Sequence, residues 1–343
     1  MTIRETIFQL KALPLVNKTH KIGGQQIGPL GPMNVLQTIL GCFGSMGELP
    51  KGFVFSAPAG YTRALAEMLR LSRSGKHEEA MKMFRLSLKQ LFDAWEIVRD
   101  ELEPLVPKER RVEYSQEVKL IEIRIFQEKI RNFVTQMEAI FRPDSDVAPN
   151  LAKAFVLSVG EQSFGEIAVR PLCEILTKFF GLNFAYLDPL QEIVAVEDEG
   201  YTELMPNVGQ SVERLKQVIL FRRSRHGESI TFVVPGFYMA KNFGSPIIAT
   251  MPFNGSDISA YILSLALESD LIYVKRDIRP LPEGGIVSLI EAQERELLAD
   301  GKKSELVATS VLRWLVESQR GLRLFDPEKG QHYYLPAGEK VEV

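Results

Sequence analysis

The sequence GFVFSAPAGYT, residues 52–62, joins a short apolar run to a turn of small residues and then to the start of a helical pattern. Apolar runs of the same kind recur at 154–158, 183–187, 230–234 and 271–274. Continuous apolar strands that alternate with helices are typical of a mostly parallel sheet buried on both faces. The sequence therefore predicts an α/β protein, a three-layer α/β/α sandwich with an open, mostly parallel sheet.

Residues 61–141 have a different pattern, which predicts helices rather than strands. Apolar residues recur at spacings of three and four from Leu65 onward, and the segment 117–141 keeps this helical spacing throughout. Pro104 and Pro107 divide the region into separate helices. We therefore expect a helical insertion between two parts of the sheet.

Composition excludes several classes of protein. The 343 residues are 45% hydrophobic, and 41 Lys and Arg balance 44 Asp and Glu to a net charge of −3. No global basic field is present to bind nucleic acid or an anionic membrane, and no run approaches the ~18 apolar residues of a membrane span. The two cysteines and four scattered histidines lack metal-ligand spacing, which favours reduced thiols and no structural zinc. A cytoplasmic protein is expected.

Residues suited to anion binding gather after the apolar runs, where the carboxyl ends of parallel strands meet. Lys21, Gly23 and Gly24 combine a point charge with backbone N–H groups that a phosphate can approach closely, although glycine-rich loops are common. Ser56 and Thr62 offer hydroxyls around the turn after the first run, and helix capping is the structural alternative.

Two later clusters have the same character. Glu161 follows a glycine at the predicted end of the strand 154–158, where a carboxylate suits a substrate ammonium group, whereas Ser163 also suits a helix cap. The stretch GSD at 255–257 opens an apolar helix and offers a hydroxyl and unpaired N–H groups, although it would serve equally as an N-cap.

The order and spacing of these clusters resemble the aspartokinases of the amino acid kinase superfamily. Six motifs follow one another from about His20 to Tyr334 in the order that this family shows. They are a lysine with Gly-Gly, SAxAGxT, SxGExxS, a PGF turn, GSDxSA, and a Glu-Ala helix that ends in Gly-x-Lys. The most specific are SVGEQS at 158–163 and NGSDISA at 254–260. The resemblance implies the amino acid kinase fold.

The resemblance also implies an amino-acid-binding lobe at 1–215, with the insertion at about 61–150, and a nucleotide-binding lobe at 216–343, without an ACT domain. It implies ATP and Mg²⁺ as cofactors, a small amino acid as substrate, and a homo-oligomer. The implied site residues are Lys21, Asp257 and Lys303 for catalysis; Ser56, Thr62, Arg63, Glu161 and Ser163 for the substrate; and Gly23, Gly24, Gly236, Gly255, Ser256 and Asp277 for phosphate and nucleotide.

The chain also departs from the family pattern. Glutamines at 25–26 replace small hydroxyl residues, and Phe253 replaces the arginine that clamps the substrate carboxylate. Arg63 or Arg170 are candidates to replace that guanidinium. The nucleotide loop, here 275–282, is about ten residues shorter than the family pattern, a loss that an irregular loop can tolerate.

Two main hypotheses follow. One is an aspartokinase-like phosphotransferase that uses ATP to phosphorylate the carboxylate of aspartate or a related amino acid, a reaction that needs charge neutralisation and positioning more than covalent help. Phe253 would allow a more apolar substrate. The other is a pseudo-kinase that binds an amino-acid-like ligand or a partner without transferring phosphate, since one fold serves many functions.

Overall fold

The computed structural model describes residues 3–24, 47–198, 200–244, 247–252, 254–274, 307–327 and 330–337. A seven-stranded sheet runs through the molecule in the order β3-β4-β2-β1-β7-β8-β9, and all neighbours are parallel except the final β8–β9 hairpin. β5 and β6 form a separate antiparallel pair. The strands are β1 (Leu15–Ile22), β2 (Leu49–Phe55), β3 (Phe184–Tyr186), β4 (Thr231–Pro235), β5 (Tyr238–Ala240), β6 (Ile248–Thr250), β7 (Asp270–Val274), β8 (Leu322–Asp326) and β9 (Gln331–Leu335).

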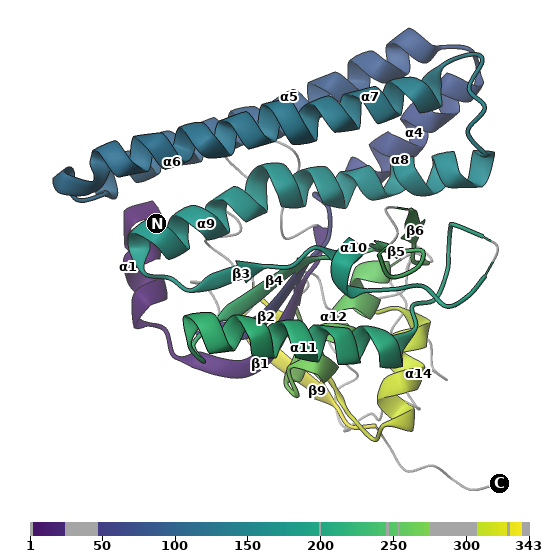
Figure 1. Cartoon of the computed structure of the whole chain (residues 1–343). Helices are drawn as coiled ribbons and strands as arrows, with labels where there is room; N and C mark the ends of the chain where they lie inside the picture. The colour runs from purple at the N-terminus through teal and green to yellow at the C-terminus, as the bar shows by residue number, and fades with distance from the viewer. Residues whose placement is uncertain are drawn as a thin grey trace, which may run out of the picture.

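Helices cover both faces of this sheet (Figure 1). On one face lie α8 (Pro149–Phe164) and α9 (Arg170–Phe180), and on the other lie α11 (Val208–His226) and α12 (Gly255–Ala266). The other helices of the described segments are α1 (Ile3–Ala12), α4 (Tyr61–Arg73), α5 (His77–Leu102), α6 (Arg111–Ile123), α7 (Arg131–Phe141), α10 (Pro189–Glu192) and α14 (Thr309–Glu317), with the short 3₁₀ turns η1 (Glu103–Leu105) and η2 (Lys108–Arg110).

Side chains from alternate strand positions fill two separate cores, because successive residues of a strand point to opposite faces. Phe53 and Phe55 of β2 pack into the core under α8 and α9, whereas Val54 packs into the core under α11 and α12. Tyr273 of β7 lies on the same side as Val54, and its neighbour Val274 lies on the other. The apolar runs that predicted a sheet buried on both faces are thus explained, and the predicted α/β fold class is confirmed.

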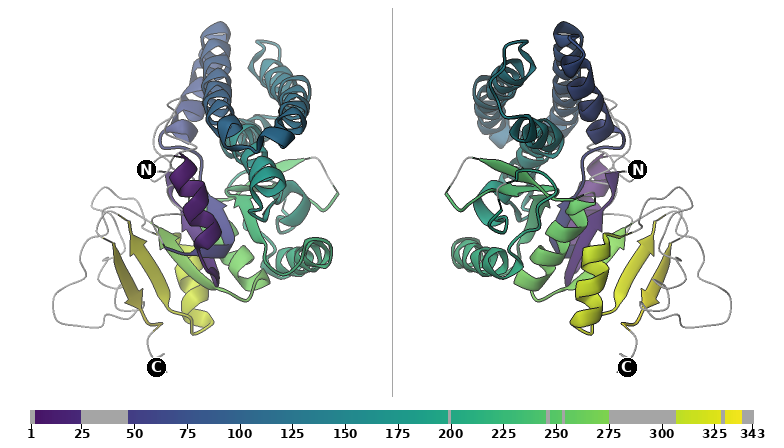
Figure 2. Two further views of the ribbon diagram at one scale, coloured as in Figure 1. Left: turned by 90° about the vertical axis from the view of Figure 1, so that its left-hand side faces the viewer. Right: turned by 90° about the vertical axis from the view of Figure 1, so that its right-hand side faces the viewer.

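The helical insertion forms an additional layer outside α8 and α9. Figure 1 shows α5 and the α6–α7 helix as a long antiparallel pair that lies over α8 and α9, and Figure 2 shows this pair close to end-on, outside the sandwich. α6 and α7 are joined without a break by a π-helical turn, η3 (Arg124–Ile130), and α8 and α9 are joined likewise by η4 (Gly165–Val169). The break between α5 and α6 lies at Pro104 and Pro107, where the sequence predicted it.

One predicted strand is wrong. Residues 154–158 lie inside α8, which begins with Pro149 in its first turn, a favoured place for proline. α8 is covered by the sheet on one side and by the insertion on the other, so its apolar residues face both ways. A short apolar run buried on all sides has the same appearance in a strand and in a helix, and the length of the segment did not decide between them.

The runs at 52–56, 183–187, 230–234 and 271–274 correspond to β2, β3, β4 and β7, which confirms these four predictions. Cys173 is a buried free cysteine, and burial raises the pKa of its thiol, whereas Cys42 lies outside the described residues. Within the described part of the chain, every helix is too short or too polar to cross a membrane.

Candidate functional site

Lys21 and Asp257 form a buried ion pair at the carboxyl end of the sheet. Lys21 is the penultimate residue of β1, and the strand register places it between Val54 of β2 and Tyr273 of β7. Its Nζ lies 2.6 Å from Oδ1 of Asp257, in the first turn of α12, and the two side chains are 4% and 0% exposed. The sheet and the N-terminus of α12 therefore bring together two residues that are far apart in the sequence.

The other carboxylate oxygen of Asp257 contacts the start of the next described helix. Oδ2 accepts a hydrogen bond of 2.9 Å from the backbone N–H of Ala308, the residue that precedes α14. Both oxygens of Asp257 are thus engaged. This arrangement suits a residue that orients the ammonium group of Lys21 better than one that removes a proton from a substrate.

Two serine hydroxyls lie together at the same edge. The Oγ atoms of Ser56, which follows β2, and Ser256, in the first turn of α12, are 2.7 Å apart. The backbone N–H of Ser56 donates to the carbonyl of Ile22, which ties the end of β2 to the end of β1. The hydroxyls and the first N–H groups of α12 provide hydrogen-bond donors for an anion near the Lys21–Asp257 pair.

Glycines allow the backbones to approach one another here. A Cβ atom on Gly236 would lie 2.4 Å from Cβ of Ser256, and one on Gly255 would lie 2.5 Å from Cβ of Met251. A Cβ atom on Gly24, after β1, would lie 2.4 Å from the carbonyl oxygen of Ala57, after β2. Gly24 and Gly236 therefore hold separate segments in contact at one edge, and Gly255 lets the start of α12 pack closely on Met251.

Replacing Gly236 by alanine is expected to lower the free energy of unfolding by about 1–3 kcal/mol, because the added methyl group would force Ser256 and the start of α12 to move. Gly209 is a matched control, because the nearest atom to its added Cβ is 3.9 Å away and it lies in the first turn of α11. Urea unfolding should show Gly209→Ala as stable as the unmodified protein or slightly more so. Equal stabilities for the two variants would contradict the packing described above.

Gly23 and the substrate-site candidates lie around the same turn after β2. The N–H of Gly23 lies 3.5 Å from the carbonyl of Val274 at the end of β7. Glu161, in the last turn of α8, accepts a hydrogen bond of 3.3 Å from the N–H of Ala57 through Oε1. Its Oε2 is buried and has no hydrogen-bond partner among the residues that the structure describes. Glu161 does not follow a strand, as the sequence predicted, but it still reaches the strand end.

The side chain of Glu161 is buried. Burial raises the pKa of its carboxyl to about 8, so that this group is largely protonated at neutral pH. The nearby phenol of Tyr61 has a pKa raised to about 12, again because of burial. The Tyr61 hydroxyl lies 3.3 Å from Oγ of Ser163, which is on α8 and also donates to the carbonyl of Gly160. A ligand cation at Glu161 would have to displace the proton.

The three remaining substrate-site candidates have different environments. Thr62 is half-buried in the first turn of α4, whereas Arg63 beside it is exposed. The guanidinium of Arg170 is engaged by Glu166 and Glu174, each at 3.1 Å. Arg170 is therefore paired with two glutamates of its own helix.

Sequence reasoning overlooked two features. The S-x-G-E pattern occurs twice, at 158–161 and at 163–166; Glu161 contacts Ala57, whereas the glutamate of the second copy pairs with Lys129 and Arg170. The structure also shows Phe237 with a φ angle of 77°, in a tight turn closed by the N–H of Tyr238 and the carbonyl of Gly236. A bulky residue in this strained region often marks a functional site.

Several predicted residues lie outside the described part of the chain. These are Lys303, Asp277, the Phe253 position, the glutamines at 25–26 and the short nucleotide loop at 275–282. In the described segments, the His, Cys, Asp and Glu side chains form no group of three placed to hold a metal ion. The described site therefore consists of the Lys21–Asp257 pair, the two serines, the glycines and Glu161.

No family model matches the sequence, and no curated protein matches it. Solved structures do match in three dimensions. Escherichia coli aspartokinase III in complex with aspartate and ADP superposes with a TM-score of 0.62 at 14% identity, over 95% of this chain and 66% of that one. The fold is therefore similar to that of this aspartokinase. The same enzyme with lysine and aspartate gives 0.62 at 14% identity, over 94% of this chain and 65% of that one.

Clostridium acetobutylicum aspartate kinase gives a TM-score of 0.57 at 13% identity, over 95% of this chain and 65% of that one. The chain thus spans about two thirds of the length of these aspartokinases. At such low identity the likeness establishes the fold and leaves the chemistry to be argued from the site.

Proposed function

We propose that this chain is a phosphotransferase that uses ATP to phosphorylate the carboxylate of aspartate or a related amino acid. The observation that carries the proposal is the buried Lys21–Asp257 pair, which lies where β1 and β7 meet the N-terminus of α12. A buried ion pair contributes little to stability compared with apolar residues of similar size, so its presence at the ligand-binding edge of a parallel sheet favours a functional role.

The donors at this edge suit a phosphate group. Lys21 supplies a positive charge, Ser56 and Ser256 supply hydroxyls, and Gly24 leaves no side chain between the segment after β1 and the turn after β2. ATP, which normally binds with Mg²⁺, would supply a γ-phosphoryl group and leave as ADP as the substrate carboxylate forms the new P–O bond. The attacking carboxylate carries no proton, so the site needs no general base, in agreement with the engagement of both Asp257 oxygens.

On this proposal, Asp257 orients Lys21, and Lys21 stabilises the negative charge of the phosphoryl group during transfer. Glu161, beside the turn after β2, would bind the ammonium group of the amino acid in its ionised form. Ser163 and Tyr61 would support that part of the site through their mutual contact. Lys303 keeps the catalytic role, and Asp277 the nucleotide-binding role, that the resemblance implies.

A ligand-binding pseudo-kinase is the second candidate. It is favoured by the pairing of the cationic side chains with carboxylates of the protein itself. Asp257 neutralises Lys21, and the guanidinium of Arg170 is held by two glutamates. With Phe253 in place of the family's arginine, none of these groups offers a free guanidinium to the carboxylate of an amino acid. Such a site would bind an amino-acid-like ligand without transferring phosphate to it.

Thermal unfolding with MgATP, and then with aspartate, tests the proposal. A ligand that binds only the folded state stabilises it by about 1.4 kcal/mol at about ten times its Kd, so millimolar MgATP should raise the Tm. The variant Lys21→Met/Asp257→Asn should lose this effect, whereas Lys18→Gln/Glu48→Gln, which removes another ion pair of β1, should keep it. A Tm that does not respond to MgATP would overturn the phosphotransferase, and a response to aspartate alone would support the second candidate.

A further inference from the structure

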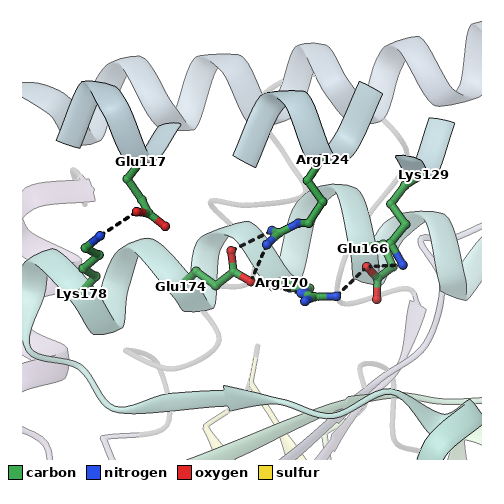
Figure 3. A network of polar contacts seen from close by, with 7 residues as sticks. All are labelled: Glu117, Arg124, Lys129, Glu166, Arg170, Glu174 and Lys178. Atoms are coloured by element: carbon green, nitrogen blue, oxygen red, sulfur yellow. Dashed lines mark hydrogen bonds and ion pairs between the residues drawn. The ribbon is translucent and has the colours of Figure 1, made fainter. Parts of the chain in front are cut away.

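The long helix formed by α8, η4 and α9 carries polar residues with two different sets of partners. Towards the sheet, Glu161 and Ser163 contact the turn after β2 and the first residue of α4. Towards the insertion, Glu166 and Glu174 contact the α6–η3–α7 helix. Figure 3 shows these last contacts as a row along the length of the helix.

Glu166 is the buried member of this row. Its side chain is 7% exposed, and its Oε2 lies 3.2 Å from Nζ of Lys129 and 3.1 Å from Nη1 of Arg170. Arg170 extends the row to Glu174, which accepts two hydrogen bonds, of 3.0 and 2.7 Å, from the guanidinium of Arg124. Two cations of the insertion are therefore linked through one chain of alternating charges to the helix that carries Glu161.

The π-helical turn of the insertion explains why both cations reach the same helix. Arg124 and Lys129 are five residues apart, and in a regular α-helix such residues point in directions about 140° apart. A π turn has hydrogen bonds between residues five apart and aligns them on one side. η3 spans Arg124–Ile130, and so this unusual turn is what directs both side chains towards α9 and η4.

The helix also contacts the sheet at the level of Glu166. A Cβ atom on Gly165 would lie 2.4 Å from the hydroxyl of Tyr186 at the end of β3, so glycine lets the helix press onto the sheet. Gly165 lies one residue before Glu166 and four residues after Glu161. At this level the helix contacts both Tyr186 of the sheet and Lys129 of the insertion.

We propose that the ion-pair cluster of Lys129, Glu166 and Arg170 is a positioning device that holds Glu161 against the turn after β2, so that the insertion controls the geometry of the substrate site. Its members are positioning residues that act on the turn through α8. The role in substrate binding rests on the proposed function, whereas the effect on the turn does not.

Amide hydrogen exchange at Ala57, whose N–H donates to Glu161, tests the proposal directly. Lys129→Met and Glu166→Gln should each speed exchange at Ala57 by about tenfold or more, as local opening of the turn becomes easier. Lys129→Arg keeps the charge and should restore slow exchange. Glu161→Ala is the positive control. Glu117→Gln removes the 2.6 Å pair with Lys178 at the far end of the same row and should leave Ala57 unchanged.

Unchanged exchange at Ala57 in both Lys129→Met and Glu166→Gln would overturn the proposal, as would an equal increase in Glu117→Gln, because a general loosening of the helix pair would then explain the result. If the unmodified protein phosphorylates aspartate, the same two variants should raise KM about tenfold with a smaller change in kcat, the pattern of lost substrate positioning. If it phosphorylates nothing, the proposed function fails, but the exchange result still decides the positioning role.

Discussion

Lys21→Met is expected to lower the free energy of unfolding by about 3–5 kcal/mol, because it leaves the carboxylate of Asp257 buried without its partner cation. The Asp257 side chain is 0% exposed, so water cannot replace the lost ammonium group without opening the site. Urea unfolding at neutral pH measures the loss, and the slope of the transition reports whether the variant still unfolds as one unit.

The double variant Lys21→Met/Asp257→Asn is the decisive companion. It removes both charges and keeps a side chain of similar shape at each position, a change that is often neutral for a buried pair. We therefore expect it to be much more stable than Lys21→Met, with a favourable coupling energy in the double-mutant cycle. Additive effects of the two substitutions would show that Lys21 and Asp257 do not interact as the structure places them.

The same strand shows why sequence reasoning did not predict β1. Thr19, His20 and Lys21 are consecutive polar residues, yet they are 0%, 1% and 3% exposed. Each has a specific partner: Oγ1 of Thr19 lies 2.6 Å from Oγ of Ser269, Nε2 of His20 lies 3.0 Å from Oε1 of Glu48, and Lys21 pairs with Asp257. Two of these partners are more than 200 residues away, and a strand buried through such contacts has no apolar run to reveal it.

The strands β2, β3, β4 and β7 were predictable because apolar side chains fill both cores, which is a local property of the sequence. The sequence also predicted that Lys21, Ser56 and residues 255–257 lie at one edge of the sheet, because the carboxyl ends of parallel strands share that edge. The sequence predicted that Glu161 follows a strand, whereas the structure brings it to the turn after β2 from the last turn of α8.

What the sequence could not decide was which of its two S-x-G-E copies faces the site. The copies are five residues apart on one helix, so their glutamates point to different neighbours. The direction of each depends on what packs on either side, here the turn after β2 and the insertion. These contacts join segments far apart in the chain, and no local pattern encodes them.

The contribution of Glu161 to the stability of the folded protein is expected to fall as the pH rises from about 5 to 8. Burial raises the pKa of Glu161 from 4.5 to about 8 in the folded protein. Between these values the unfolded chain has released the proton and the folded chain keeps it, so the unfolded state binds fewer protons and rising pH favours unfolding. The full difference corresponds to about 5 kcal/mol, complete once the pH exceeds the folded-state pKa.

Glu161→Gln isolates this contribution. Glutamine has nearly the same shape, can accept the hydrogen bond of the Ala57 N–H, and does not ionise. Urea unfolding at a series of pH values should therefore give a flatter profile for Glu161→Gln, and the difference between the two profiles should grow up to about pH 8. Burial also raises the pKa of Glu192 to about 7, so Glu192 makes the protein less stable as the pH rises. Its contribution is the same in both proteins and cancels when the profile of Glu161→Gln is subtracted from that of the unmodified protein. Parallel profiles for the two proteins would mean that the carboxyl of Glu161 is solvated or paired with a cation in the folded state. Such a result would contradict the buried position of Glu161 beside the turn after β2.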